Sequence, residues 1–134
     1  DIPGFYIDMK QVDNSRTIAV PAGADKKQTS AAEELQRIFY EKTGLMLEIV
    51  NDSGTSNAAF VISDEKASAD SCHEIVVLDG KLVFSSSAKS GVAACVEVFI
   101  DNYLADTFDS INFPADFRYL DLGDYLAVSY PDAN

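Results

Sequence analysis

Two segments of the chain place apolar residues at the spacing of an α-helix. In the first segment the apolar stripe consists of Ala31, Leu35, Ile38, Phe39 and the aliphatic stem of Lys42. Ser30 and Glu33 before the stripe form a capping-box pattern, and Gly44 after it is typical of a left-handed helix stop. The sequence therefore predicts a capped helix from Ser30 to Gly44, with Glu33 paired to Arg37 on its polar side.

The second segment runs from about Ser90 to Leu104 and carries a comparable stripe. Its apolar positions are Val92, Val96, Phe99, Ile100 and Tyr103, and its outward polar positions are Glu97, Asp101 and Asn102. Ala93 and Ala94 are small enough to let this helix lie close to a neighbour. We therefore predict a second amphipathic helix.

Short runs of apolar and β-branched residues surround the two helices. The predicted strands cover residues 5–7, 17–21, 45–50, 58–63, 74–78 and 81–86. The continuous apolar run over 58–63 is typical of a central strand, and Asp79-Gly80 is typical of a tight hairpin turn. This order predicts an α+β fold, namely an α/β two-layer sandwich whose mixed sheet carries both helices on one face.

Length and composition fit a single domain over residues 1–134. The chain has 134 residues, of which 47% are hydrophobic, so it can bury a core without a metal or a disulfide. No run approaches the roughly 18 apolar residues that cross a bilayer, and we expect no membrane insertion. Residues 105–134 form a C-terminal extension whose pattern is weaker and whose aromatic residues are Phe108, Phe113, Phe117, Tyr119, Tyr125 and Tyr130.

The charge is strongly one-sided, with 22 acidic against 10 basic residues and a net charge of −12. This balance argues against nucleic acid as a partner, because phosphates attract Lys and Arg. It also disfavours anionic lipid surfaces. No EF-hand calcium loop is present, so we interpret the acids as a solvated surface.

Few residues are candidates for catalysis. His73 is the single histidine, and a zinc-protease helix would need a second one at position 77, which is valine. We therefore expect no metal and no other cofactor. Cys72 and Cys95 are the two cysteines; Cys95 is most simply a core residue, and a disulfide between the two remains open. A catalytic thiol is disfavoured because Cys72 and His73, as neighbours in a strand, point to opposite faces.

Two further candidates concern binding. The serines at 85–87, followed by Ser90 at a helix start, could hold an anion on free backbone N–H groups. Lys89 is weak support and no phosphate-loop motif is present, which favours a plain strand-to-helix connection. In the extension, Tyr119 and Tyr125 are candidate contacts for a sugar, although the chain has no Trp. The alternative is that these rings pin the extension onto the body of the domain.

A family resemblance is carried by the helical and hairpin segments. Residues 31–50 resemble a segment in the N-terminal, non-catalytic α/β domain of bacterial β-N-acetylhexosaminidases and α-glucuronidases, where a helix ends in Thr-Gly and leads into a strand. Residues 60–63 are similar to the strand that follows. Residues 79–84 and 91–104 resemble the hairpin and the closing helix, so that the resemblance covers about 17–104.

The resemblance implies a mixed sheet with two helices on one face, zincin-like but without a metal site, beside a (β/α)₈ barrel that holds the active site. Three departures matter. Serines 85–87 stand where relatives often carry glycines, the usual lead into the barrel is not recognisable after Leu104, and the sequence contains no barrel. No catalytic residue of the family can therefore be carried over to this chain.

We expect a non-catalytic accessory domain of an exported, bacterial, glycoside hydrolase-like protein. Its first residue, Asp1, is not Met, and we interpret the chain as a piece of a longer polypeptide that is secreted or cell-surface. Its partner would be a neighbouring domain. One alternative is a self-standing module that binds a glycan or a protein, and another is a small enzyme with an unrecognised site.

Overall fold

The computed structural model of the protein describes residues 4–51, 57–106 and 109–121. The strands are β1 (Gly4–Ile7), β2 (Lys10–Gln11), β3 (Thr17–Ala19), β4 (Glu48–Val50), β5 (Ala58–Ile62), β6 (His73–Leu78), β7 (Lys81–Ser86), β8 (Ser110–Phe113) and β9 (Arg118–Asp121). The helices are α1 (Lys26–Thr43), α2 (Gly91–Phe99) and the π-helix η1 (Ile100–Leu104), which continues α2 directly.

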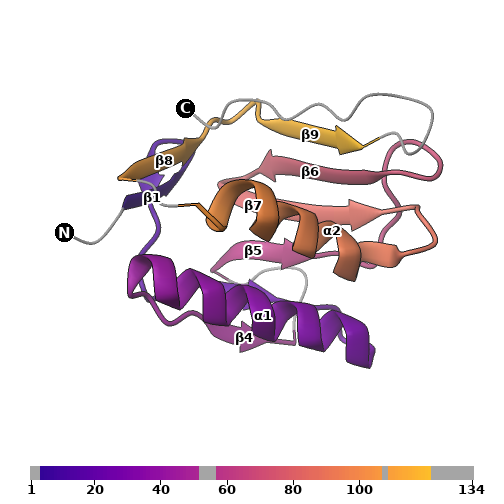
Figure 1. Ribbon diagram of the computed structural model, residues 1–134, viewed down its shortest axis with the longest axis horizontal. Helices are drawn as coiled ribbons and strands as arrows, with labels where there is room; N and C mark the ends of the chain where they lie inside the picture. Colours follow the sequence, from indigo (N-terminus) through magenta and orange to yellow (C-terminus); the bar gives the residue numbers. More distant parts are fainter. Residues whose placement is uncertain (1–3, 52–56, 107–108, 122–134) are drawn as a thin grey trace.

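The described strands form a six-stranded and a three-stranded sheet. The large sheet has the order β4-β3-β5-β7-β6-β9, and within it β6 runs antiparallel to both of its neighbours while the other pairs are parallel. Both helices cover one face of this sheet, and their apolar side chains share one core with it (Figure 1). The predicted two-layer sandwich with a mixed sheet and its helices on one face is confirmed.

The small sheet consists of β1 with β2 antiparallel on one side and β8 parallel on the other. It packs against the helix layer through Phe5, whose ring centroid lies 5.0 Å from that of Phe39 on α1. Within the small sheet, the Phe5 ring centroid lies 5.3 Å from that of Phe113 on β8. The predicted strand at 5–7 therefore exists, but it belongs to a second sheet that the sequence pattern did not indicate.

Phe60, on the central strand β5, lies at the middle of the core. Its ring contacts the rings of Phe39 from α1, Phe5 from β1, Phe99 from α2 and Phe84 from β7, with centroid distances of 5.3, 5.6, 5.9 and 6.2 Å. Aromatic pairs at such distances add about 0.5–1.5 kcal/mol each beyond the area that they bury. One side chain thus links both helices and the small sheet to the large sheet.

The opposite face of the large sheet carries no helix in the described part of the chain. Cross-strand pairing aligns one residue from each of five strands in a single aliphatic row: Val50, Ala19, Val61, Val83 and Val76. Ala19 and Val61 are buried, and the other three are partly exposed. This face therefore has a smaller core of its own.

The predicted hairpin and central strand are confirmed. Asp79 and Gly80 have φ of 51° and 73°, and a two-residue turn with positive φ at both positions matches the twist of the two strands that it joins. All five residues of β5 are buried. The strands predicted at 17–21 and 45–50 are present in shorter form, as β3 and β4.

The start of α1 differs from the prediction. Asp25 is the N-cap: its carboxylate accepts a hydrogen bond from the Gln28 N–H at 2.8 Å, and Gln28 Oε1 accepts one from the Asp25 N–H at 2.9 Å. The expected cap, Ser30, lies inside the helix. Asp25 and Gln28 form an equivalent capping box five residues earlier, and the intervening lysines favour helix, so nothing delays its start.

The other end of α1 follows the prediction, whereas one predicted ion pair does not form. Gly44 adopts φ of 78° and donates its N–H to the Tyr40 carbonyl at 2.8 Å. Arg37 binds Glu34 at 2.7 Å and Glu41 at 2.8 Å, so the expected pair with Glu33 is wrong. Both observed partners lie one helical turn from Arg37, at i,i+3 and i,i+4 spacing.

The extension after residue 104 belongs to the body of the domain. It supplies β8 to the small sheet and β9 to the edge of the large sheet, beside β6. Phe113, Phe117 and Tyr119 are buried, so the expectation that these rings pin the extension onto the domain is confirmed for them. Phe108, Tyr125 and Tyr130 lie outside the described residues.

The position of Phe60 predicts a large cost for its removal. We expect Phe60→Ala to lower the free energy of unfolding by about 3–5 kcal/mol, because it leaves a cavity between four other rings. Leu78 is 59% exposed, and the control Leu78→Ala should change stability by less than about 0.5 kcal/mol. Urea unfolding measures both, and similar costs for the two variants would contradict the proposed centre of the core.

The capping geometry gives a second prediction. Asp25→Ala should destabilise the protein by about 1 kcal/mol, because it removes the acceptor for the Gln28 N–H. Ser30→Ala should be neutral or slightly stabilising, because alanine is favoured inside a helix. Urea unfolding of the two variants under the same conditions decides between the two caps. A larger loss of unfolding free energy for Ser30→Ala than for Asp25→Ala would show that Ser30 is the N-cap.

Candidate functional site

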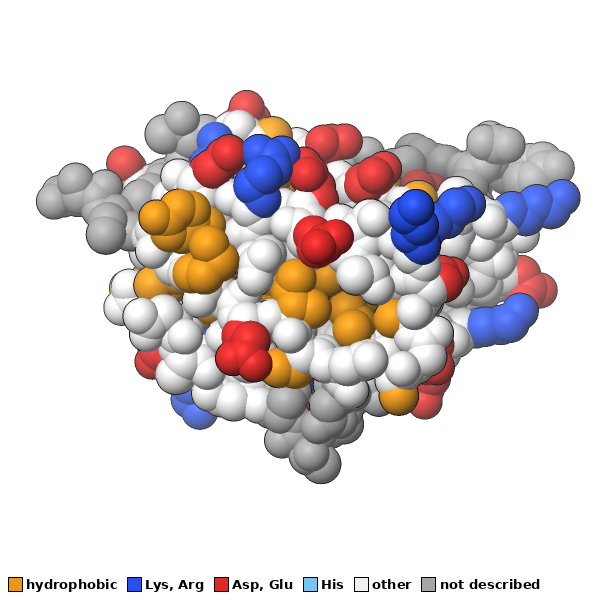
Figure 2. Space-filling view, turned by 90° about the horizontal axis from the view of Figure 1, so that it is seen from below, with side chains coloured by type: hydrophobic (Ala, Val, Ile, Leu, Met, Phe, Trp, Pro, Cys, Tyr) orange, Lys and Arg blue, Asp and Glu red, His pale blue; other side chains and the backbone are white. Residues whose placement is uncertain are grey.

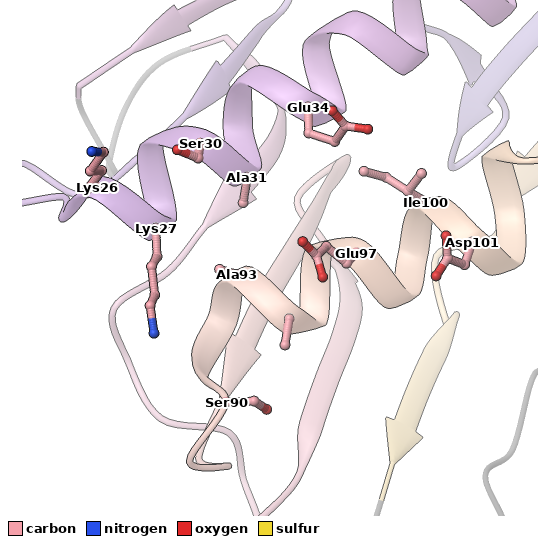
Figure 3. A pocket seen from close by; sticks show the side chains of 11 residues that line it. Lys26, Lys27, Ser30, Ala31, Glu34, Ser90, Ala93, Glu97, Ile100 and Asp101 are labelled. Carbon is pink, nitrogen blue, oxygen red and sulfur yellow. The ribbon is translucent and has the colours of Figure 1, made fainter.

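An open groove with a volume of about 940 Å³ lies between α1 and α2 (Figure 3). The helices run side by side in the same direction, because each follows a strand from the parallel part of the sheet (Figures 1 and 3). Ala31, Ala93, Ala94 and Ile100 provide apolar lining along its length. The groove is therefore apolar along its base and bordered by two helices that run in the same direction.

The two ends of the groove carry opposite charges. Lys26 and Lys27 lie at one end, where α1 begins, near Ser90 at the start of α2 (Figure 3). Glu34, Glu97 and Asp101 lie further along the two helices. The groove therefore changes from basic to acidic along the common direction of the helices.

Elsewhere the exposed apolar residues are dispersed. On the face seen from below, apolar side chains form small patches separated by acidic and basic ones (Figure 2). The large apolar residues that are exposed in the described part of the chain are Met9, Tyr40, Met46 and Leu78. Scattered residues of this kind are ordinary for a protein surface.

His73 lies in β6 and joins the hairpin to the start of α2. Its Nδ1 is 2.7 Å from Ser86 Oγ, and its Nε2 is 3.4 Å from Ser90 Oγ. The residue is 8% exposed, and burial lowers the pKa of His73 below its ordinary value, partly opposed by the charge of Asp121. The imidazole thus connects secondary-structure elements and has a low tendency to take up a proton.

The serines that were candidates for anion binding make hydrogen bonds within the domain. Ser86 Oγ accepts from the Ala88 N–H at 3.1 Å, and Ser87 Oγ accepts from the Cys72 N–H at 3.2 Å and donates to the Ala69 carbonyl. These contacts fasten the loop before β6 to the end of β7. They agree with a plain strand-to-helix connection.

Both cysteines are buried free thiols. Cys95 donates weakly to the Glu74 carbonyl at 3.7 Å, and burial raises its pKa to about 12. The prediction that Cys95 is a core residue is confirmed, and the disulfide that the sequence left open is not formed. Cys72 Sγ donates to the Ala69 carbonyl at 3.2 Å.

A second polar cluster, on β6 and β9, was not recognised from the sequence. Glu74, only 8% exposed, accepts hydrogen bonds from Arg118 Nε at 2.8 Å and from the Ser68 N–H and Oγ at 3.0 Å. Burial would raise the pKa of Glu74, but the hydrogen bonds from Ser68 and Arg118 outweigh it and lower the pKa. The cluster binds the loop before β6 and the edge strand β9 to one carboxylate. It unites positions 68, 74 and 118, which no local motif connects.

The two tyrosines proposed as ligand contacts have different outcomes. Tyr119 is fully buried in the core, away from any surface that a ligand could meet. Tyr125 lies outside the described residues, so its role stays a prediction. Among the residues that the structure describes, no three His, Cys, Asp or Glu side chains gather as a metal site would require. No helix in the described ranges is long and apolar enough to span a membrane.

Comparison with known proteins gives a likeness of fold. No protein-family model matches the chain, and no curated protein sequence matches it. The solved structure of the GH20 β-N-acetylhexosaminidase from Streptomyces coelicolor A3(2) is similar, with a TM-score of 0.54 at 11% sequence identity. The match covers 88% of this chain and 22% of that chain. At this identity the likeness concerns the fold alone: the domain is folded like a part of a much larger glycoside hydrolase.

The environment of His73 predicts a pH dependence of stability. Because its pKa is lowered on folding, the unfolded chain binds more protons than the folded chain at pH values just below 6.5. Stability should therefore fall as the pH decreases from 7.5 to 5.5, and His73→Gln should remove most of this slope. Urea unfolding at a series of pH values measures it. If His73→Gln kept the wild-type dependence of stability on pH, groups other than His73 would be responsible. Glu74 is not one of them, because its pKa is lowered from 4.5 and it titrates below this pH range.

Proposed function

We propose that this chain is a non-catalytic accessory domain of an exported, bacterial, glycoside hydrolase-like polypeptide. One observation carries the proposal: nearly the whole chain, 88% of it, matches the fold of a 22% portion of a β-N-acetylhexosaminidase. A domain that occupies so small a share of an enzyme leaves most of that enzyme to hold its active site. The domain would then pack beside the catalytic or glycan-binding part and position it.

The described polar clusters support a structural role. His73 is held by Ser86 and Ser90, and Glu74 by Ser68 and Arg118, so each ionisable group connects elements of the fold. A general acid or base needs a pKa near the working pH and access to a substrate. The lowered pKa of Glu74 and its burial suit a fixed carboxylate better than a proton donor.

An accessory domain acts through its interface with its neighbour. Interfaces between domains of one chain commonly bury about 600–1,500 Å², which is enough to stabilise the neighbour and to fix its orientation. Removal of such a domain exposes the surface that it covered. We expect its removal to lower the stability of the neighbouring domain and to leave the catalytic activity of that domain in place.

This proposal is tested with the complete reading frame from the source genome. We expect it to encode a glycoside hydrolase domain whose turnover of aryl β-N-acetylglucosaminide and related glycosides persists without residues 1–134. Its melting temperature should fall by about 2–4 °C for each kcal/mol of interface that is lost. The isolated 134-residue chain is the control and should show no turnover.

Two results would overturn the proposal. One is a complete reading frame that encodes only this domain and a leader. The other is glycoside or ester hydrolysis by the isolated chain that disappears in a Cys72→Ala or His73→Gln variant, which would revive the small enzyme.

A further inference from the structure

The last strand that the structure describes, β9, lies at one edge of the large sheet. It has β6 on one side, and among the described strands none lies on its other side (Figure 1). The outer side of an edge strand presents backbone N–H and C=O groups that can pair with a further strand. The residues that follow β9 in the sequence are the nearest candidates for that position.

The sequence after β9 has the pattern of a hairpin turn and a short strand. Gly123-Asp124 is a dipeptide typical of two-residue hairpin turns, in which glycine tolerates the positive φ of the first position. Residues 125–130 read Tyr-Leu-Ala-Val-Ser-Tyr and place an apolar residue at every second position. Pro131 follows this run, and proline cannot donate a hydrogen bond to a strand ladder.

We propose that residues 125–130 form a further strand of the large sheet, antiparallel to β9 and joined to it by a turn at Gly123-Asp124. The chain itself then occupies the outer edge of β9. Two features of the described residues, the hydrogen bonds of β9 and the faces of its side chains, each fix the register of this pairing.

The hydrogen bonds between β9 and β6 determine which backbone groups point outward. The Val77 N–H donates to the Phe117 carbonyl at 3.3 Å, in the same register as the other pairs of the two strands. Because hydrogen-bonded pairs alternate along an antiparallel ladder, the backbone groups of Arg118 and Leu120 point away from β6. The next outward position is 122. A two-residue turn needs the residues on either side of it, here 122 and 125, to form a hydrogen-bonded pair, and the alternation provides this.

The side chains select the same register. With 122 opposite 125, Val128 lies opposite Tyr119, Tyr130 lies opposite Phe117, and Leu126 lies on the same face nearer the turn. Phe117 and Tyr119 are buried in the core that contains both helices. All three apolar side chains of the new strand therefore extend that core. This agreement is independent of the hydrogen-bond argument, because it concerns the faces of the strand and not its edges.

A shift by one residue would lose both agreements. A three-residue turn over 122–124 would set Tyr125 opposite Asp121, whose backbone groups point toward β6. It would also turn Ala127 and Ser129 toward the core and Val128 away from it, since a one-residue slip exchanges the two faces of a strand. Only the two-residue turn satisfies the backbone and the side chains together.

The added strand determines which partners can reach this side of the domain. It closes the edge of β9 to strands of other molecules. It places Tyr130 in the core, whereas Tyr125 lies beside the turn on the sheet face that carries no helix in the described part of the chain. Tyr125 is then the tyrosine of the C-terminal extension that a glycan or a neighbouring domain can contact. None of these steps depends on the proposed accessory function.

Nuclear magnetic resonance of the complete 134-residue chain, labelled with ¹³C and ¹⁵N, tests the pairing. Opposed residues without mutual hydrogen bonds have Cα atoms about 4.5 Å apart, which brings their Hα atoms close together. We expect Hα–Hα nuclear Overhauser effects between Tyr119 and Val128 and between Asp121 and Leu126. The amides of Arg118 and Leu120 should exchange with deuterium at least about tenfold more slowly than in the unfolded chain.

Two neighbouring substitutions test the faces of the strand. Val128→Lys places a charge on the core side and should accelerate exchange of the Arg118 and Leu120 amides at least about tenfold. The matched control Ser129→Lys adds the same charge one residue later, on the other face, and should change these rates by less than about threefold. Val128→Lys should also unfold at a lower urea concentration than Ser129→Lys.

Four results would overturn the inference. These are the absence of both Overhauser effects, effects that fit the shifted register, exchange of the Arg118 and Leu120 amides at the rate of the unfolded chain, and equal responses to the two substitutions. Overhauser effects between labelled and unlabelled chains in a mixed sample would assign the edge of β9 to a second copy, and would also contradict the strand proposed within one chain. The reading-frame test of the accessory function is unaffected by any of these results.

Discussion

The packing of Phe60 against rings from four other elements is the interaction on which the rest of the structure depends. Phe39 and Phe99 bring α1 and α2 onto the same ring, and Phe5 brings the small sheet. Because both helices meet one side chain on one face of β5, they must lie side by side. The groove between them is a consequence of that shared contact, and so is the absence of a helix from the opposite face in the described part of the chain.

Features that depend on a few neighbouring residues could be predicted from the sequence. Asp79-Gly80 specifies its turn because both residues tolerate positive φ, and Gly44 ends α1 for the same reason. The start of α1 depends on an equally local signal, yet the sequence predicts it at the wrong residue. The chain contains two capping-box patterns, and the pattern alone does not show which of them begins the helix. The first one, at Asp25, takes effect because the lysines after it continue the helix without a break.

Features that depend on pairing between distant segments could not be predicted. β8 and β9 have four residues each, and their apolar positions become informative only once β1 and β6 are in place beside them. Glu74 is similar: its sequence neighbours give no reason for a buried carboxylate, which requires Arg118 from β9. The burial of Tyr119 could not be predicted for the same reason, because it follows from the pairing of β9 with β6. Long-range pairing also decides which side chains remain available to a ligand.

The topology of the sheet determines the electrostatics of the groove. β3 and β7 are both parallel to β5, so the helices that follow them return in one direction and present their positive ends together. In a bundle of antiparallel neighbours the two dipoles would partly cancel, and charged residues at the ends would have little directional effect. Here the dipoles add, and charges at the ends of the helices agree with them. The Asp25 carboxylate caps the first turn of α1, and Lys42 in its last turn also donates to the Ala105 carbonyl just beyond η1.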